Sequence, residues 1–372
     1  MSAARLPRDL HPVAWWVWAL GLAAAASLTT NPLVLLTVVA VAALVVSARR
    51  SEQPWARSFR LYCWMGVVIV VIRVAFRILF GGGGEIVLLP LPTVPLPDWV
   101  EGFTLLGPVT LESLLAGLYD GLRLAAIVIC VGAANALANP KRLLRSVPPA
   151  LYEVGTALVV AVTVLPQFAD SLRRVRAAQA LRGGESGRVR GLRRLLVPVL
   201  EDALERSLAL AAGMDARGYG RAAGLSPADR RRTGALMLGG LLGICVGTYA
   251  LLDRTAPRLL ALPMLGLGVA VAVAGLASAG QRVERTRYRP DPWRWPELVV
   301  MASGVVAGAT GWWVSTHQVA LAYPALDAWP QVSGVALAGL LVALGGGLCA
   351  PPPAVPRTLR ELPTDVPEAV AA

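Results

Sequence analysis

Two segments of the sequence place an arginine directly before a glycine, at the end of a polar stretch that favours helix. The segments are Ala180-Leu181-Arg182-Gly183 and Ala216-Arg217-Gly218. An arginine in the last turn of a helix interacts favourably with the helix dipole, and a following glycine lets the chain turn away at once. The guanidinium then projects from a blunt helix end as a rigid fork of donors, suited to carboxylates and carbonyl oxygens in a groove of a soluble partner. An ordinary basic helix cap would explain one such segment alone, but two segments of this kind favour docking to a soluble partner.

Charged residues inside apolar runs form a second group that could do chemistry. Arg73 and Arg77 lie in one run, and Asp120 and Arg123 lie in another. Asp120 is about ten residues into its run, roughly 15 Å deep at 1.5 Å per residue. Ionisable groups at that depth are costly and are normally paired or functional. Asp120 can pair with Arg123 at i, i+3, and Arg73 can join them across spans. We favour a structural tie over a direct transport role.

The other reactive residue types do not predict a reaction centre. The four cysteines lie in or beside apolar runs without paired spacing, and the two histidines are far apart. Cysteines in such positions are typical of small buried hydrophobic residues rather than of metal ligands or disulfides. The sequence also contains no GxxxxGK[ST] segment, so we do not expect the chain to bind ATP. It therefore predicts no catalytic residue, no metal site and no cofactor.

The composition indicates that the lipid bilayer surrounds most of the chain. The 372 residues are 56% hydrophobic and only 16% charged, with a mean hydropathy of +0.60. The apolar residues form blocks of about 20, the length that crosses a bilayer core. We therefore predict an all-α polytopic membrane protein with about eight transmembrane helices and long cytoplasmic coupling helices. The expected spans are about 12–29, 31–48, 61–80, 110–137, 234–252, 257–279, 296–314 and 331–349.

The net charge of +12 is concentrated in particular connections between the spans. Residues 47–60 and 280–295 are rich in arginine, whereas 81–108 and 315–330 contain acidic residues but no lysine or arginine. Basic loops remain on the cytoplasmic side of a membrane, so this distribution predicts a multi-pass protein of the cell membrane with both termini in the cytoplasm. The same distribution argues against nucleic acid as a partner.

The longest charged region, 138–233, reads as a cytoplasmic segment between two sets of about four spans, 1–137 and 234–350. We expect a short basic helix after Asn139-Pro140, a second helix over about 150–182 and a third over about 192–217. The apolar run 149–168 is long enough to cross, but basic clusters flank it on both sides. We favour a helix that lies on the inner leaflet over a ninth span. A cytoplasmic tail, 351–372, is expected to be disordered.

Together these motifs resemble the transmembrane T component of energy-coupling factor (ECF) transporters, the EcfT and CbiQ-like family. The similarity rests first on AAQALRGG and GMDARGYG, the two segments that contain Arg182 and Arg217, and is best over about 109–221. The further segments that carry it are His11-Pro12, Val109-Thr110-Leu111-Glu112, Gly121-Leu122-Arg123-Leu124, Asn139-Pro140 and the kink at Leu165-Pro166.

The resemblance implies a non-catalytic scaffold that links a substrate-binding membrane S component to two ABC ATPase subunits. Two long coupling helices cross over the ATPases in this family, and ATP hydrolysis on the partners drives uptake of vitamins or transition metals. By this match the docking residues are Leu181, Arg182, Gly183, Ala216, Arg217 and Gly218. Leu181 stands where many members have a small residue, and the spans beyond about 255 exceed the smaller members.

Two other functions remain open from the residues themselves. A secondary transporter would use the intramembrane Asp120 and Arg123 without a nucleotide-hydrolysing partner. A membrane-embedded enzyme acting on an anionic lipid would use the arginine-rich segment as its headgroup site, but it needs a positioned nucleophile, histidine or carboxylates. The substrate is not readable from this chain, since the S component sets it in this family.

Overall fold

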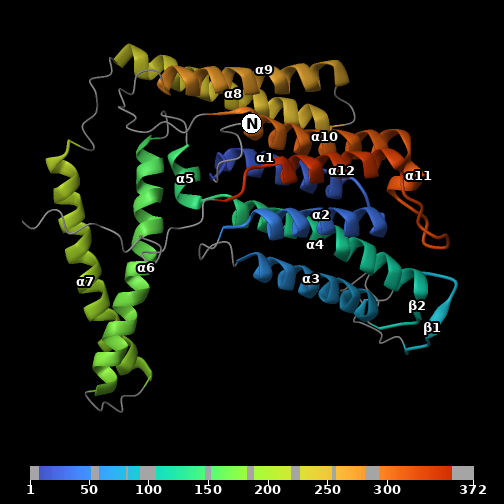
Figure 1. Cartoon of the computed structure of the whole chain (residues 1–372), viewed down its shortest axis with the longest axis horizontal. Coiled ribbons are helices and arrows are strands. Elements are labelled where there is room, and N and C mark those ends of the chain that lie inside the picture. Colours follow the sequence, from blue (N-terminus) through green and yellow to red (C-terminus); the bar gives the residue numbers. More distant parts are fainter. Residues whose placement is uncertain are drawn as a thin grey trace, which may run out of the picture. The chain divides into compact units, whose positions relative to one another are not determined.

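The computed structural model describes residues 8–51, 58–80, 83–92, 106–146, 152–181, 188–218, 227–253, 257–280 and 293–353. These residues form an all-α membrane protein with one short pair of strands (Figure 1). In chain order the elements are α1 (Pro12–Ser27), α2 (Pro32–Arg49), α3 (Phe59–Leu79), β1 (Val87–Leu89), β2 (Val109–Thr110), α4 (Leu111–Leu137), α5 (Pro140–Arg145), α6 (Tyr152–Leu181), α7 (Arg188–Ala216), α8 (Pro227–Leu252), α9 (Arg258–Gly280), α10 (Trp295–His317), α11 (Val319–Ala322) and α12 (Gly334–Cys349).

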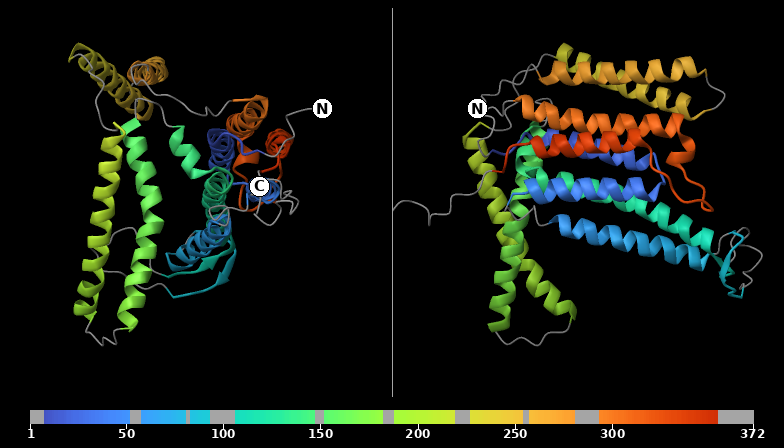
Figure 2. Two further views of the ribbon diagram at one scale, coloured as in Figure 1. Left: turned by 60° about the vertical axis from the view of Figure 1, so that its left-hand side comes forward. Right: turned by 45° about the vertical axis from the view of Figure 1, so that its right-hand side comes forward.

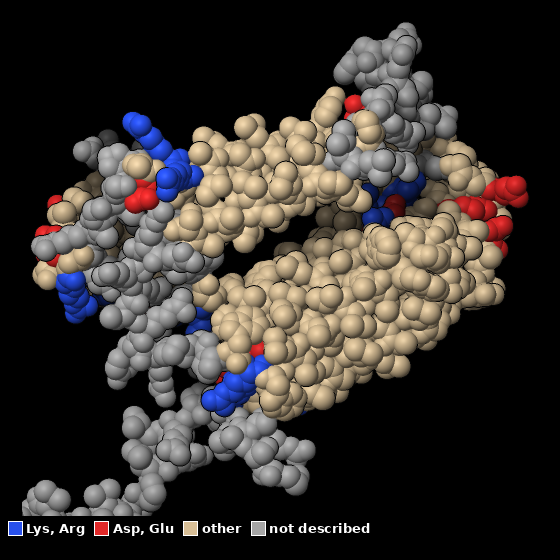
Figure 3. Space-filling view, turned by 90° about the horizontal axis from the view of Figure 1, so that it is seen from above, with Lys and Arg blue, Asp and Glu red and all other residues tan. Residues whose placement is uncertain are grey.

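The eight spans expected from the sequence correspond to α1, α2, α3, α4, α8, α9, α10 and α12. Among the described residues, seven helices are long and apolar enough to cross a membrane: α2, α3, α4, α6, α8, α9 and α10. The helices α1 and α12 are apolar but shorter. Figure 3 shows long stretches of uncharged surface, with charged side chains towards their ends. Whether the apolar run 149–168 crosses the membrane therefore stays open, because α6 is long enough to do so.

The chain divides into two compact units, Met1–Leu143 with Asp291–Ala372, and Leu144–Pro290. The first unit holds the spans α1 to α4 together with α10 and α12. The second unit holds α6, α7, α8 and α9. The C-terminal spans are thus shared between the units, since α10 and α12 fold with the N-terminal spans and α8 and α9 do not.

The first unit is held together by close approach of helices at small residues. A Cβ built on Gly21 of α1 or on Gly304 of α10 would overlap the backbone of the facing helix. The buried Trp18 of α1 donates from Nε1 to the carbonyl oxygen of Ala343 in α12, at 3.0 Å. Small-residue contacts of this kind let helices pack closely where lipid removes the hydrophobic drive for association. The C-terminal helices therefore form part of the same core as α1.

The turn between α1 and α2 is fixed by a buried asparagine. Asn31 is fully buried, and its side-chain oxygen accepts from the backbone N–H of Leu33 at 3.1 Å, which caps α2. Its amide nitrogen donates to the carbonyl oxygens of Leu321 and Gln331, at 2.9 and 2.6 Å. The amide nitrogen thus joins this turn to segments 290 and 300 residues away in the sequence. The short Thr29–Pro32 connection is therefore a rigid corner of the fold.

The second unit contains two helix pairs. In one pair, α8 and α9 pack through glycines, since a Cβ on Gly243 or Gly268 would meet the backbone of the other helix. In the other pair, α6 and α7 lie side by side (Figure 2). These are the two long helices predicted over about 150–182 and 192–217, and both are observed with nearly those bounds. A third prediction, the Asn139 cap of α5, is also confirmed, because its side chain accepts from the backbone N–H groups of Lys141 and Arg142.

Candidate functional site

The end of α7 has the geometry that the sequence predicts. The last helical residue is Ala216. The N–H of Arg217 donates to the carbonyl oxygen of Met214 at 3.1 Å, and that of Gly218 to Asp215 at 2.9 Å. Gly218 has a φ of +77°, in the left-handed region that glycine adopts at helix ends. The chain turns at once, so the exposed Arg217 stands at a blunt helix end.

The corresponding end of α6 is described up to Leu181. That residue ends the helix with a side chain that is 90% exposed. Arg182 and Gly183 lie outside the described residues, as do residues 354–372 of the predicted tail. Single exposed leucines are common on protein surfaces, so this exposure alone assigns no role to Leu181.

A polar cluster joins the two long helices well before their ends. Asp202 of α7 accepts a hydrogen bond from Ser171 Oγ of α6 at 2.5 Å. It also pairs with Arg206 Nε at 2.9 Å and with Arg174 Nη2 of α6 at 3.7 Å. The Ser171 hydrogen bond, helped by Arg206, holds the pKa of the Asp202 carboxyl below its usual value. Ser171 is buried, so this cluster defines how α6 and α7 are aligned.

One row of apolar side chains on α7 is left exposed. Leu200, Leu204 and Leu208 are 57%, 61% and 63% exposed, whereas Val199 is fully buried. Residues four apart share one face of a helix, so the three leucines form a continuous apolar row. We call Leu200, Leu204 and Leu208 the leucine row. Among the described residues no element covers it.

The intramembrane charges pair differently from the sequence expectation. Asp120 of α4 pairs with Arg77 of α3, with 3.4 Å between its Oδ2 and the Nη2 atom, and not with Arg123 or Arg73. Gly117 lies one turn before Asp120, and a Cβ there would meet Arg77 Cγ at 2.8 Å. The glycine thus makes room for the arginine to reach across α4. The pair ties α3 to α4, as a structural role requires.

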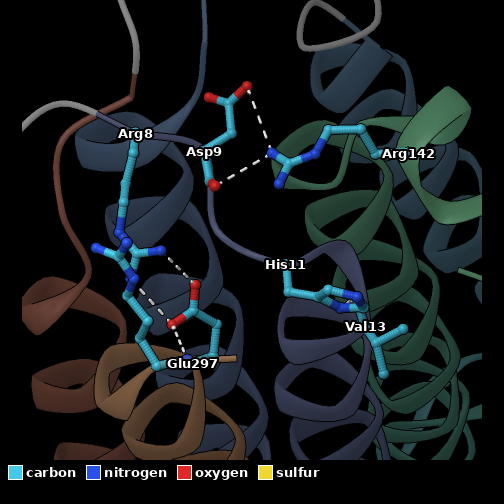
Figure 4. Close-up of polar contacts among 7 residues, drawn as sticks. Arg8, Asp9, His11, Val13, Arg142 and Glu297 are labelled. Atoms are coloured by element: carbon cyan, nitrogen blue, oxygen red, sulfur yellow. Dashed lines mark hydrogen bonds and ion pairs between the residues drawn. The ribbon is translucent and has the colours of Figure 1, made fainter. Parts of the chain in front are cut away.

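The N-terminal segment carries a polar cluster that the sequence did not predict (Figure 4). Arg8 makes two contacts to Glu297 of α10, with 2.9 Å from Nη1 to Oε1 and 3.0 Å from Nη2 to Oε2. Glu297 is 1% exposed and also accepts from the backbone N–H of Arg294 at 3.2 Å. A glutamate at the third position of a helix is read as a capping residue. Its arginine partner, 289 residues away, has no signal in the sequence.

The next residues of the same segment reach other elements. Asp9 accepts from Arg142 of α5, with Nη1 3.1 Å from its carbonyl oxygen and 3.8 Å from its carboxylate. His11 stacks on Trp293, with ring centroids 4.5 Å apart. Arg142 stands near the start of the charged segment, so the N-terminal residues link that start to α10. The segment before α1 and the start of α5 therefore lie in one region of the first unit.

None of these side chains forms a metal site, because no group of three His, Cys, Asp or Glu residues converges in the described ranges. The arrangement instead consists of exposed helix ends and structural ion pairs.

Comparison with known proteins gives consistent matches. The CbiQ family, described as cobalt transport protein, matches residues 3–225. An energy-coupling factor transporter transmembrane protein EcfT from Bacillus selenitireducens is 28% identical over 200 residues, which cover 52% of this chain and 71% of that protein. An EcfT protein from Leuconostoc gelidum subsp. gasicomitatum is 27% identical over 191 residues, covering 44% of this chain and 71% of the relative.

Proposed function

Because the chain belongs to the CbiQ cobalt transport protein family and is an ECF transporter T component, we propose that it couples two ABC ATPases to a membrane S component. ATP would be hydrolysed on the partner subunits, and this chain would transmit their closure to the membrane. The cargo would be a micronutrient, either a vitamin or a transition metal, selected by the S component. The chain itself would be non-catalytic.

The observation that carries this proposal is the end of α7. Arg217 is exposed where the helix stops, and Gly218 turns the chain away without a side chain beside it. Such an end can enter a groove, where the guanidinium would meet carboxylates or carbonyl oxygens in the fork geometry that arginine favours. By the family match Arg182 makes the second contact, on the other ATPase. Leu181, Gly183 and Ala216 would flank the two arginines.

The transmission of force follows from how the two helices are joined. The Asp202 cluster fixes α7 against α6 through Ser171 and Arg174, so the two ends would move together. A rigid pair turns closure of an ATPase dimer into movement of the whole helical segment. Movement at the start of that segment would reach the spans through Arg142 and Asp9.

The proposed orientation places residues 138–233 and both termini in the cytoplasm of a cell-membrane protein. The basic connections support it by the positive-inside rule. Under this orientation α6 would lie along the inner leaflet rather than cross, because a crossing would separate Lys141 and Arg142 from Arg173 and Arg174. The leucine row of α7 would then face the S component, whose membrane surface is apolar.

The test is to purify the full chain with its candidate ATPases and to reverse both docking charges in a double variant, Arg182→Glu with Arg217→Glu. We expect complex formation and ATP-dependent uptake to be lost. The matched control reverses two exposed arginines away from the ends of α6 and α7, Arg50→Glu with Arg176→Glu, and should leave assembly intact. If the docking variant still assembles and transports, the coupling-helix proposal is wrong.

A further inference from the structure

A polar pocket lies at one end of the first unit, beside the N-terminal segment. It is narrow and opens to solvent, and the space of about 400 Å³ between its walls includes this open part. Its polar lining comes from Arg8, Asp9, Arg49, Ser51 and Asn139. Its apolar lining comes from Leu10, Trp15, Leu137, Pro351 and Pro353. The pocket thus offers charged donors on one part of its wall and an apolar surface on the other.

Two buried donors of this pocket lack a partner. The Nε–H groups of Arg8 and Arg49 are both buried, and neither makes a hydrogen bond within the described part of the chain. The terminal nitrogens of Arg8 are used by Glu297, and Nη2 of Arg49 donates to the carbonyl oxygen of Leu348. Leaving a buried charged donor unmatched is costly, so such groups usually have a ligand, an ion or water.

The charge of the pocket leaves a single excess cation. Arg8 is balanced by Glu297, and Asp9 is balanced by Arg142. Arg49 has no carboxylate within ion-pair distance among the described residues. The site is therefore suited to a ligand with one negative charge and several acceptor oxygens, and phosphate diesters have that chemistry.

The position along the helices indicates the source of that phosphate. Arg49 is the last residue of α2, Leu137 is the last of α4, and α1 begins two residues after Leu10. Where apolar helices cross a bilayer, their ends stand at the level of the lipid headgroups. This end also carries Arg50, Lys141 and Arg142, the mark of the cytoplasmic side. We propose that the mouth of the pocket binds the phosphate of an anionic phospholipid of the inner leaflet.

The test uses the purified full-length chain in mild detergent, titrated with phosphatidylglycerol or phosphatidylcholine and followed by native mass spectrometry. We expect one phosphatidylglycerol molecule to bind in preference to phosphatidylcholine. Arg49→Gln should weaken that binding about tenfold, since one charged hydrogen bond is worth at least that factor. Arg49→Lys keeps the charge but loses the Nε–H, and should give a smaller loss. Arg50→Gln, the adjacent arginine outside the pocket, should bind like the wild type.

Equal phosphatidylglycerol binding by Arg49→Gln and the wild type would overturn the site. So would an equal loss in Arg50→Gln, which would indicate general surface charge. Full displacement of the lipid by millimolar inorganic phosphate would overturn the lipid assignment in favour of a free anion. The lipid-free thermal transition of each variant, compared with the wild type, shows whether it is folded. The readout involves no ATPase, so it succeeds or fails independently of the docking proposal.

Discussion

The buried pair between Arg8 and Glu297 is the contact whose removal should most affect the stability of the spans. Replacing Arg8 with methionine leaves the carboxylate of Glu297, 1% exposed, with only the Arg294 N–H as a partner. Breaking a buried pair by removing one partner costs about 3–5 kcal/mol, because the remaining charge is uncompensated. The arginine side chain is 22% exposed, so some water replaces it and we expect the lower figure, about 3 kcal/mol.

The second change in this cycle removes the charge and keeps the cap. In Glu297→Gln the amide oxygen can still accept from the Arg294 N–H, and Arg8 can turn towards solvent. We expect a loss of about 1 kcal/mol, typical of one hydrogen-bonded partner. The double variant Arg8→Met with Glu297→Gln should be little worse than Glu297→Gln alone. The coupling energy of the cycle is then about 3 kcal/mol, at the upper end of the range for residues in direct contact.

The assay is reversible unfolding of the purified chain in mixed detergent and SDS micelles, followed by tryptophan fluorescence. The four proteins of the cycle are compared at one pH and ionic strength. If the effects of the single variants simply add in the double variant, the carboxylate does not depend on Arg8. That result would mean that the N-terminal segment does not stabilise α10 through Arg8.

Three further outcomes follow from other contacts. The pKa of Asp202 is lowered in the folded chain, so the stability that its carboxylate contributes is present above its usual pKa of 3.8 and is lost as the pH falls below it. The distance between spin labels on α6 and α7 should therefore stay constant from pH 7 to 5 and widen under stronger acid. In Asp202→Asn this acid-induced change should be absent. Asp120→Asn and Arg77→Gln should each lower stability by about 1 kcal/mol, and their combination by no more; loss of uptake in a fully assembled Asp120→Asn complex would instead favour a transport role. Gly304→Ala should destabilise by about 1–3 kcal/mol through overlap with α1, whereas Gly345→Ala in α12, which has open space, should be neutral in the same unfolding measurement.

The order of the helices and the geometry at the end of α7 could be predicted from the sequence, because the signals for both are local. The end of α7 depends on Arg217 followed by glycine, and the structure puts Gly218 in the left-handed conformation that this pattern requires. Docking at that end, and at Arg182 outside the described residues, stays a prediction. The pairing of β1 with β2 was not predicted, because strands this short have no periodicity to detect.

The sequence alone determined the membrane class, the spans and the location of the long charged helices, since length and hydrophobicity act within each segment. It did not determine which basic residue pairs with which acidic residue. Arg77 rather than Arg123 pairs with Asp120, because α3 packs closely on Gly117 of α4 and this packing brings Arg77 beside Asp120. Glu297 pairs with Arg8 only because α10 packs on α1 through Gly21 and Gly304. Helix rotation and helix neighbours are properties of the packed bundle, so the tertiary structure decided these partners and the pocket beside them.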